Sequence, residues 1–315
     1  MNSSRERGVL NLSNAAEPAR MVTRRSMVMN ADATTEGLRR FLLGGRNRDG
    51  GWGYQSRKAS RLEPTCWALM AMPDVDGSIL VNWPSVNALL VERLGGSANY
   101  GFHGLALLGL RALKLEHSGG NEALIRGIQA VKGKKLPNTE VTRQDNALQA
   151  WSWIEDTFSW VEPTAWCLLA LKSYRSSHPT VIESSRIDVA ERVLFDRHCV
   201  GGGWNYGNSN VYGQSLKPFV PTTSIGLLAL QDRPQQAEVR LGIEFLERNG
   251  TSERSGMALS LAIIALNIIG SSTTAAIRDA AMAQISTTIA FGNHMAAAML
   301  LFALRDEGSY APFRI

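Results

Sequence analysis

The stretch EPTCWALMAM, residues 63–72, decides the fold because the chain repeats it. It returns as EPTAWCLLAL at residues 162–171 and, in a looser form, as PTTSIGLLAL at residues 221–230. The same place in each copy holds a threonine: Thr65, Thr164 and Thr223. Self-similarity of this kind is the sequence signature of a repeat architecture, so more divergent copies are expected elsewhere in the chain.

Three weaker copies complete the set, at residues 103–110, 256–263 and 294–301. All six segments are rich in Ala and Leu and apolar on almost every side, which indicates helices that are buried all round or face a cavity. Pro64 and Pro163 suit the first turn of such a helix, where the missing N–H costs nothing.

Segments with one apolar and one charged face lie between these copies. They are residues 34–43, 84–94, 121–131, 187–197, 235–247 and 273–288. An inner helix has protein behind it and a central hole before it, whereas an outer helix meets water, so the alternation predicts two concentric rings. We therefore expect an all-α fold, an (α/α) toroid of about six helical hairpins whose parallel inner helices begin at one mouth. Residues 145–153 are either a seventh inner element or part of a long connection.

The composition agrees with a chain that buries much of its surface. Of its 315 residues, 44% are hydrophobic and 19% charged, below the roughly 25% charged that is usual in soluble domains. The net charge of +5 reflects basic residues in the first 50 positions. No basic stripe with interleaved aromatics follows, so no nucleic-acid partner is expected.

The chain carries no sign of export or membrane insertion. Residues 1–30 lack the apolar run of a secretory signal and are expected to form a mobile arm, followed by one toroid domain over residues 31–315. No apolar stretch reaches the roughly 18 residues that span a membrane. Three scattered cysteines are too few for a disulfide framework or a CxxC metal site, so a cytoplasmic protein with reduced thiols is expected.

A second phrase, a glycine pair followed by tryptophan, occurs as DGGWGY at residues 49–54 and GGGWNY at residues 201–206. The glycines permit a tight left-handed turn after an outer helix. This turn, followed by a Pro-Thr-Ala-Trp helix, resembles the repeat of squalene and oxidosqualene cyclases, class II diterpene cyclases and protein prenyltransferase β-subunits. The resemblance covers roughly residue 34 onward and implies a single toroid, whereas squalene-cyclase-like enzymes carry two such domains.

The resemblance also implies an acid. In class II cyclases the motif Asp-x-Asp-Asp-Thr-Ala stands at the start of one inner helix, and its third position protonates an alkene or epoxide. Aligned through the threonine, that position falls on Glu63 and on Glu162, while the first and fourth Asp are missing. Arg61 is expected to hold Glu63 ionised by pairing with it, which makes Glu162 the better acid. The alternative is that both glutamates only stabilise helix N-termini.

Parallel inner helices would bring both glutamates to one rim, where His103 and His294 take the aligned threonine position of weaker copies and Asp145 joins them as a further catalytic candidate. Convergent titratable groups over an apolar cavity are typical of an active site. The alternative for each histidine is a purely structural role.

The aromatic residues of the repeats supply candidate substrate contacts. Trp67 and Trp166 lie one turn into inner helices, and ring faces there could stabilise a carbocation by roughly 0.5 to 2 kcal/mol each. Phe102, Tyr206 and Arg61 are the other substrate-binding candidates. Packing between helices is the alternative for the first two tryptophans and the favoured interpretation for Trp52 and Trp204.

Metal and phosphate signals are weak. Prenyltransferase β-subunits hold zinc with an Asp-x-Cys pair and a distant His, but the nearest cluster, residues 196–199, has the wrong order and lies at the end of an outer helix. The Asp-Asp-x-x-Asp sequence of class I terpene synthases and a Gly-rich phosphate loop are both absent, so no metal or cofactor is expected. A diphosphate could dock where helix N-termini gather. The cations available there are Arg57, Lys58, Arg61, Arg143 and Lys217.

These features together predict a class II type terpenoid cyclase that starts a carbocation cyclisation or isomerisation of a polyprenyl substrate by protonation, without metal. Two alternatives stay open: a non-catalytic toroid that binds a hydrophobic ligand or a protein partner, and a protein similar to a zinc-less prenyltransferase β-subunit. Whether the substrate carries a diphosphate, whether the protein touches a membrane peripherally, and its oligomeric state are left open.

Overall fold

The computed structural model describes residues 35–81, 100–115, 120–154, 156–305 and 307–315. Within these ranges the regular secondary structure is helical apart from one short hairpin, in which β1 (Asn210–Val211) pairs antiparallel with β2 (Gln214–Ser215). The all-α fold class is therefore confirmed. The expected arm at residues 1–30 and the expected outer helix at residues 84–94 lie outside the described residues.

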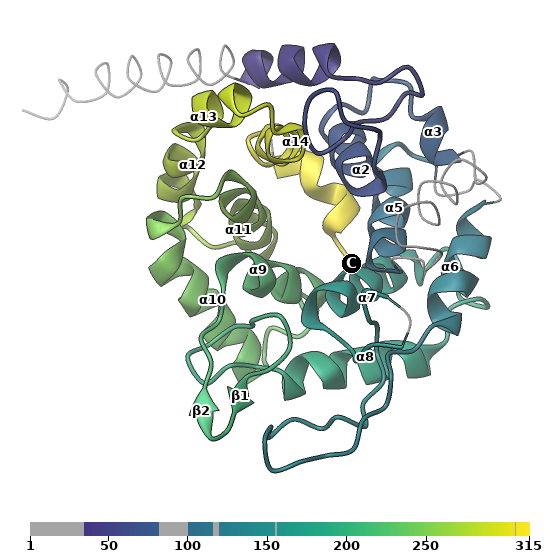
Figure 1. Ribbon diagram of the computed structural model, residues 1–315, viewed down its shortest axis with the longest axis vertical. Coiled ribbons are helices and arrows are strands. Elements are labelled where there is room, and N and C mark those ends of the chain that lie inside the picture. Colours follow the sequence, from purple (N-terminus) through teal and green to yellow (C-terminus); the bar gives the residue numbers. More distant parts are fainter. Residues whose placement is uncertain (1–34, 82–99, 116–119, 155, 306) are drawn as a thin grey trace, which may run out of the picture.

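Six of the described helices form a closed inner ring (Figure 1). They are α2 (Leu62–Ala71), α5 (Tyr100–Ala112), α7 (Val161–Tyr174), α9 (Val220–Ala229), α11 (Gly256–Ile269) and α14 (His294–Ala303). Each contacts the next in chain order, and α14 contacts α2, which closes the ring. These are the six repeated segments of the sequence, so repetition alone located the inner wall.

Amphipathic helices surround this ring. They comprise residues 35–44, α6 (Gly120–Ala130), α8 (Ser184–Asp196), α10 (Ala237–Asn249), α12 (Thr274–Met282) and α13 (Ile285–Ala290). The short helices α3 (Ser78–Val81) and η1 (Gly250–Ser252) lie in connections. The expected single helix over residues 273–288 is in fact two, because the break between α12 and α13 lets the first pack on α11 and the second on α14.

A tryptophan clamp joins outer to inner helices. The indole Nε1 of Trp52 donates to the carbonyl of Leu42 in the outer helix (2.7 Å), and the backbone N–H of Trp52 donates to Oγ1 of Thr65 in α2 (2.9 Å). The left-handed turn before it falls on Gly50 (φ 88°). The same two bonds recur at Trp151 with Ile128 and Thr164, and at Trp204 with Leu194 and Thr223. The repeated threonines are thus explained by a structural role.

Residues 145–153 are this clamp's third copy rather than a seventh inner helix, because they form an irregular loop that places Trp151. The signal lay in the spacing. Trp151 precedes Thr164 by 13 residues, as Trp52 precedes Thr65. The missing glycine pair concealed the relationship, since residues 149–150 are Gln-Ala.

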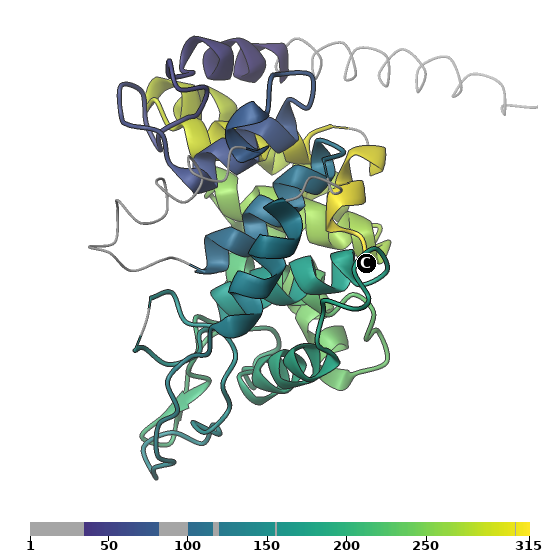
Figure 2. The same cartoon turned by 90° about the vertical axis from the view of Figure 1, so that its right-hand side faces the viewer.

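The ring is closed at one end by the 3-10 helix η2 (Glu307–Phe313), which follows α14 and turns back toward the centre (Figure 1). It contacts α5, α7 and α11. Figure 2 shows η2 at one end of the inner helices and the β1–β2 hairpin at the opposite end.

Candidate functional site

A cavity of about 300 Å³ lies inside the ring, where the inner helices begin. Five of the six inner helices supply its described lining, and Tyr206 comes from a loop. The lining residues are Glu63, Trp67, Glu162, Trp166, Tyr206, Pro221, Thr222, Ile225, Ser255, Met257, Ala258, Leu261, Met295 and Met299. The second residue of each of the five helices α2, α7, α9, α11 and α14 is among them, so these helices begin at one mouth and run parallel, as the repeats predicted.

The two glutamates meet in this cavity. Glu63 and Glu162 each occupy the second position of their helix and are half-buried. Burial raises the pKa of each carboxyl from 4.5 to about 7, because the charged form loses solvation. The charge of Glu162 raises the pKa of Glu63 further, which places the two groups within electrostatic reach of each other.

Each carboxylate also has a hydrogen-bond donor that opposes this rise. The Tyr54 hydroxyl donates to Oε2 of Glu63 over 2.6 Å, and a hydrogen bond with the Trp166 side chain lowers the pKa of Glu162. A bond to the charged form favours that form. The pKa of each carboxyl therefore lies near neutral pH, where the group can either donate or accept a proton.

The expected ion pair between Arg61 and Glu63 does not form. Arg61 is the N-cap of α2, with an extended backbone whose N–H donates to the carbonyl of Trp52 (2.7 Å). Residues two apart at a helix start do not face each other, so the guanidinium is not presented to the carboxyl. Arg61 also does not line the cavity.

Trp67 and Trp166 form the deep part of the cavity. Each follows its glutamate by four residues and so lies one turn further along the same helix face. Their rings contact each other edge-on at 6.0 Å between centroids, and both side chains are buried. Met295, Met299 and Leu261 add apolar wall. The expectation that this pair of tryptophans faces the hole agrees with their place in the lining.

Tyr54 ends the DGGWGY phrase, but its pairing with Glu63 is not among the predictions from the sequence. A signal for it exists, because Tyr54 and Tyr206 both stand two residues after a clamp tryptophan. The backbone carbonyl of Tyr54 accepts from the N–H of His294, and that of Tyr206 from the N–H of Val161. Each tyrosine is thereby fixed beside the start of an inner helix, at the mouth of the cavity.

The histidine candidates do not join the glutamates. His294 begins α14, but its Nδ1 lies 3.2 Å from the Gly53 carbonyl and its Nε2 3.2 Å from Oγ of Ser56, while its ring packs on Phe41. It therefore faces the outer layer. His103 is buried in α5, and burial lowers its pKa to about 4. Neither lines the cavity.

Phe102 and Asp145 also lie elsewhere. The Phe102 ring packs edge-on against Trp153 at 5.8 Å, and no described residue of α5 lines the cavity. Asp145 belongs to the loop of the third clamp, where its carboxylate accepts from the N–H of Ala147 (2.9 Å) and from Asn138 (3.3 Å). The prediction that Asp145 and the histidines converge with the glutamates is wrong, because Asp145 and His294 bond to neighbouring loops and His103 lies outside the cavity lining.

The cluster at residues 196–199 is engaged in structural bonds. Asp196 pairs with Arg197 and accepts from the N–H of Asp145, and Nε2 of His198 accepts from the N–H of Gly203 (3.1 Å). In the described part of the chain, no three His, Cys, Asp or Glu side chains gather in a way that could hold a metal ion.

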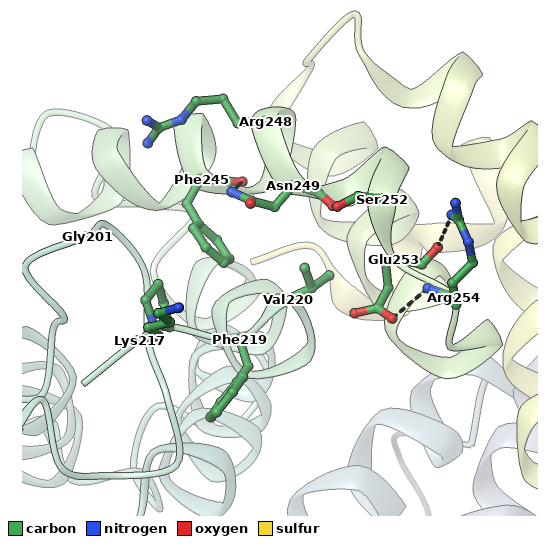
Figure 3. Close-up of a pocket in the computed structure, with 11 residues that line it drawn as sticks. Gly201, Lys217, Phe219, Val220, Phe245, Arg248, Asn249, Ser252, Glu253 and Arg254 are labelled. Atoms are coloured by element: carbon green, nitrogen blue, oxygen red, sulfur yellow. Dashed lines mark hydrogen bonds between the residues drawn. The ribbon is translucent and has the colours of Figure 1, made fainter.

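A second hollow, a groove of about 510 Å³, lies beside the starts of α9 and α11 (Figure 3). Lys217, Arg248 and Arg254 bring positive charge to it, and the backbone N–H of Arg254 donates to the Glu253 carboxylate (2.6 Å). The other expected phosphate cations line neither this groove nor the cavity; they are Arg57, Lys58, Arg61 and Arg143.

No protein-family model matches the chain, and no curated protein matches it significantly. Among solved structures it is similar to a type II terpene cyclase from Scytonema, in complex with its substrate geranylgeranyl dihydroxybenzoate. The identity is 15%, the match covers 90% of this chain and 98% of the other, and the TM-score is 0.47. At that level the likeness carries no argument about activity. None of the described helices has the length and apolar character needed to cross a bilayer.

Proposed function

We propose that this protein is a metal-independent terpenoid cyclase or isomerase that protonates an isoprenoid substrate in the central cavity. The observation that carries the proposal is the meeting of Glu63 and Glu162, each with a pKa raised to about 7, over a pocket floored by two buried tryptophans. A carboxylic acid that keeps its proton near neutral pH is suited to general acid catalysis.

Glu63 is as good a candidate for the acid as Glu162. The sequence-based preference for Glu162 depended on an ion pair between Arg61 and Glu63, and that pair is absent. The repulsion between the two carboxylates is reciprocal, so it keeps one proton on the pair near neutral pH without selecting its carrier, and we write the reaction with Glu63 as the acid. The Tyr54 hydroxyl occupies Oε2 of Glu63, which leaves Oε1 to carry the proton.

The proposed reaction conserves atoms. The proton of Glu63 adds to one carbon of a double bond, whose electron pair forms the new C–H bond and leaves a carbocation on the other carbon. A second double bond then closes the ring, and the Glu162 carboxylate removes a proton from a carbon next to the final cation. The indole faces of Trp67 and Trp166 stabilise the cation by roughly 0.5 to 2 kcal/mol each. The product is an isomer of the substrate, and water at the open mouth returns the proton to Glu63.

The reacting end of the substrate is best pictured as neutral. The described lining contains two carboxyl groups and no Lys or Arg, so an anionic diphosphate inside the cavity would meet repulsion. An alkene or epoxide avoids it. A charged group at the far end of the substrate would instead find cations in the groove of Lys217 and Arg248.

The test is to incubate the protein with neutral polyprenes and their epoxides in D₂O and to analyse the products by mass spectrometry. From a polyprene, acid-initiated cyclisation gives an isomer with one carbon-bound deuterium from the exchanged carboxyl. From an epoxide the deuteron goes to the new hydroxyl, where it exchanges, so the cyclised isomer itself is the readout. Glu63→Gln should abolish the product while a bound substrate analogue is retained. Exposed Glu244 on α10 provides the matched control, because Glu244→Gln removes the same charge far from the cavity. If Glu63→Gln and Glu162→Gln both remain fully active, the acid assignment is wrong. If the wild type binds the analogue but forms no product, the protein is a toroid that only binds its ligand.

A further inference from the structure

The end of the cavity away from its mouth is filled by side chains of η2. Phe313 is fully buried and stacks on Trp67, with 5.7 Å between ring centroids and 19° between the planes. It also contacts Trp166 at 6.1 Å and Phe302 at 5.4 Å. Trp67 and Trp166 line the cavity, so the Phe313 ring lies directly behind the cavity floor.

Beyond this aromatic layer, the surface around η2 is hollowed. Two hollows of about 760 and 320 Å³ flank η2 at that end, and both are lined by Gly308 and Ser309 of η2. Met70 of α2 lines the second of them, whereas Trp67, almost one turn earlier on the same helix, lines the central cavity. The aromatic layer held by Phe313 is therefore a partition between the central cavity and the hollowed surface beside η2.

The segment that carries Phe313 is fastened to three separate helices or helix ends. Gln231, which follows α9, donates to the carbonyl of Phe313 (2.7 Å) and accepts from the N–H of Ile315 (3.3 Å). Arg111 of α5 donates to the carbonyl of Arg314 (2.8 Å). Arg278 of α12 donates to the hydroxyl of Tyr310 (3.3 Å). These hydrogen bonds fix the position of η2 along the ring. A fixed position is required if Phe313 is to limit the length of the cavity.

We propose that Phe313 is a specificity-determining residue that fixes the depth of the cavity and thereby limits the length of the isoprenoid chain the protein accepts. The inference rests on the proposed function for the identity of the ligand, but the partition itself is independent of catalysis. A cavity of about 300 Å³ is at the small end of ligand pockets. Removing the Phe313 ring frees space under Trp67, into which that indole or the end of a longer chain can move.

The experiment measures the affinity of straight-chain primary alcohols of increasing length, read from quenching of tryptophan fluorescence or by calorimetry. Affinity should rise by about fourfold per methylene, which corresponds to about 0.8 kcal/mol, until the chain meets the floor, and then stop rising. In Phe313→Ala this break should move to longer alcohols, and the first alcohols beyond the original break should gain at least about fourfold in affinity. In Phe313→Trp the break should move to shorter ones.

Phe291, which is 75% exposed and outside the cavity lining, provides the control, because Phe291→Ala makes the same change at the surface. Should Phe313→Ala fail to fold by circular dichroism, Phe313→Leu gives a smaller shift in the same direction. A folded variant whose break does not move overturns the inference. Saturated alcohols cannot be cyclised, so their affinities report on the cavity alone. If the break shifts but the wild type forms no isomer from polyprenes, this inference stands and the proposed enzyme is rejected. If isomers form but the break does not move, the proposed enzyme stands and this inference is rejected.

Discussion

The Tyr54 hydroxyl donates a 2.6 Å hydrogen bond to the Glu63 carboxyl, joining the first tryptophan turn of the chain to the helix it precedes. This bond opposes the effect of burial on the carboxyl. Burial and the Tyr54 hydrogen bond therefore have opposite effects on Glu63. Burial keeps the proton on its carboxyl near neutral pH, and the hydrogen bond makes that proton easier to release.

Tyr54→Phe should raise the pKa of Glu63 above about 7, because it removes the donor that stabilises the charged form. Tyr54 is 39% exposed, so we expect a shift of about one unit rather than the full value of a buried charged hydrogen bond. The high-pH limb of kcat/KM should move upward by that amount, and kcat at its plateau should fall because the acid is weaker. Tyr212→Phe, at the exposed hairpin, is the control. An unmoved limb would mean that Glu63 does not supply the proton.

The two raised pKa values also predict a cost in stability. Each carboxyl binds its proton more tightly in the folded state than at its ordinary pKa of 4.5. The native state therefore holds more protons between pH 4.5 and about 7, so the free energy of unfolding falls as pH rises through that window and the cost is complete above it. Glu63→Gln should raise the free energy of unfolding by about 1 to 3 kcal/mol at about pH 8 and by nothing near pH 4.

Urea titrations at both pH values measure this difference. Glu162→Gln should behave alike, and the double variant should gain less than the sum of the two, because each charge contributes to the other's cost. Glu244→Gln, on the exposed face of α10, should change stability little at either pH. Equal stability of wild type and Glu63→Gln at about pH 8 would mean that the carboxyl is better solvated than its position indicates.

The sequence was sufficient for the features that repeat. Three copies of one phrase located the inner helices, and alignment through Thr65 and Thr164 brought Glu63 and Glu162 to equivalent positions, which the ring then places at one mouth. The same reasoning failed for His294. Its helix position does align, but the direction of its side chain is set by Gly53 and Phe41, which come from an unrelated part of the chain.

Features that occur once were not predictable in this way. Phe313 stands in a short 3-10 segment with no counterpart among the repeats, and only the closed ring shows that it reaches the centre. The pairing of Tyr54 with Glu63 depends on the path of the turn between them. Composition and helical periodicity do not predict that path. Long-range contacts that are not repeated leave no period in the sequence.

His294 should prove structural. His294→Leu removes the contacts to Gly53 and Ser56 and should lower the free energy of unfolding by about 1 to 3 kcal/mol, while the product pattern stays that of the wild type. Burial lowers the pKa of His294 below its ordinary 6.5, so the wild type loses stability as pH falls below that value. The variant should lose less between about pH 7 and 5. A loss of turnover without a loss of stability would return His294 to the catalytic candidates.

The tryptophan clamps give a prediction that can be checked three times in one chain. The variants Thr65→Val, Thr164→Val and Thr223→Val keep the side-chain shape but remove the acceptor of the backbone N–H of a buried tryptophan. Each loss should lower the free energy of unfolding by about 1 to 3 kcal/mol. The acceptor distances are 2.9, 3.3 and 3.0 Å in that order, so Thr164→Val should cost the least.

Exposed Thr251 supplies the control, because Thr251→Val changes the same group where water can replace it. If all three clamp variants unfold within about 0.5 kcal/mol of this control, the clamp contributes no stability. If Thr164→Val costs the most, the length of the hydrogen bond from Trp151 to Thr164 does not govern how much this clamp stabilises the fold. The expected order would show that the Trp151 turn, which lacks the glycine pair, still forms the clamp with a longer hydrogen bond. It would also show that the repeat requires the threonine hydroxyl at this position.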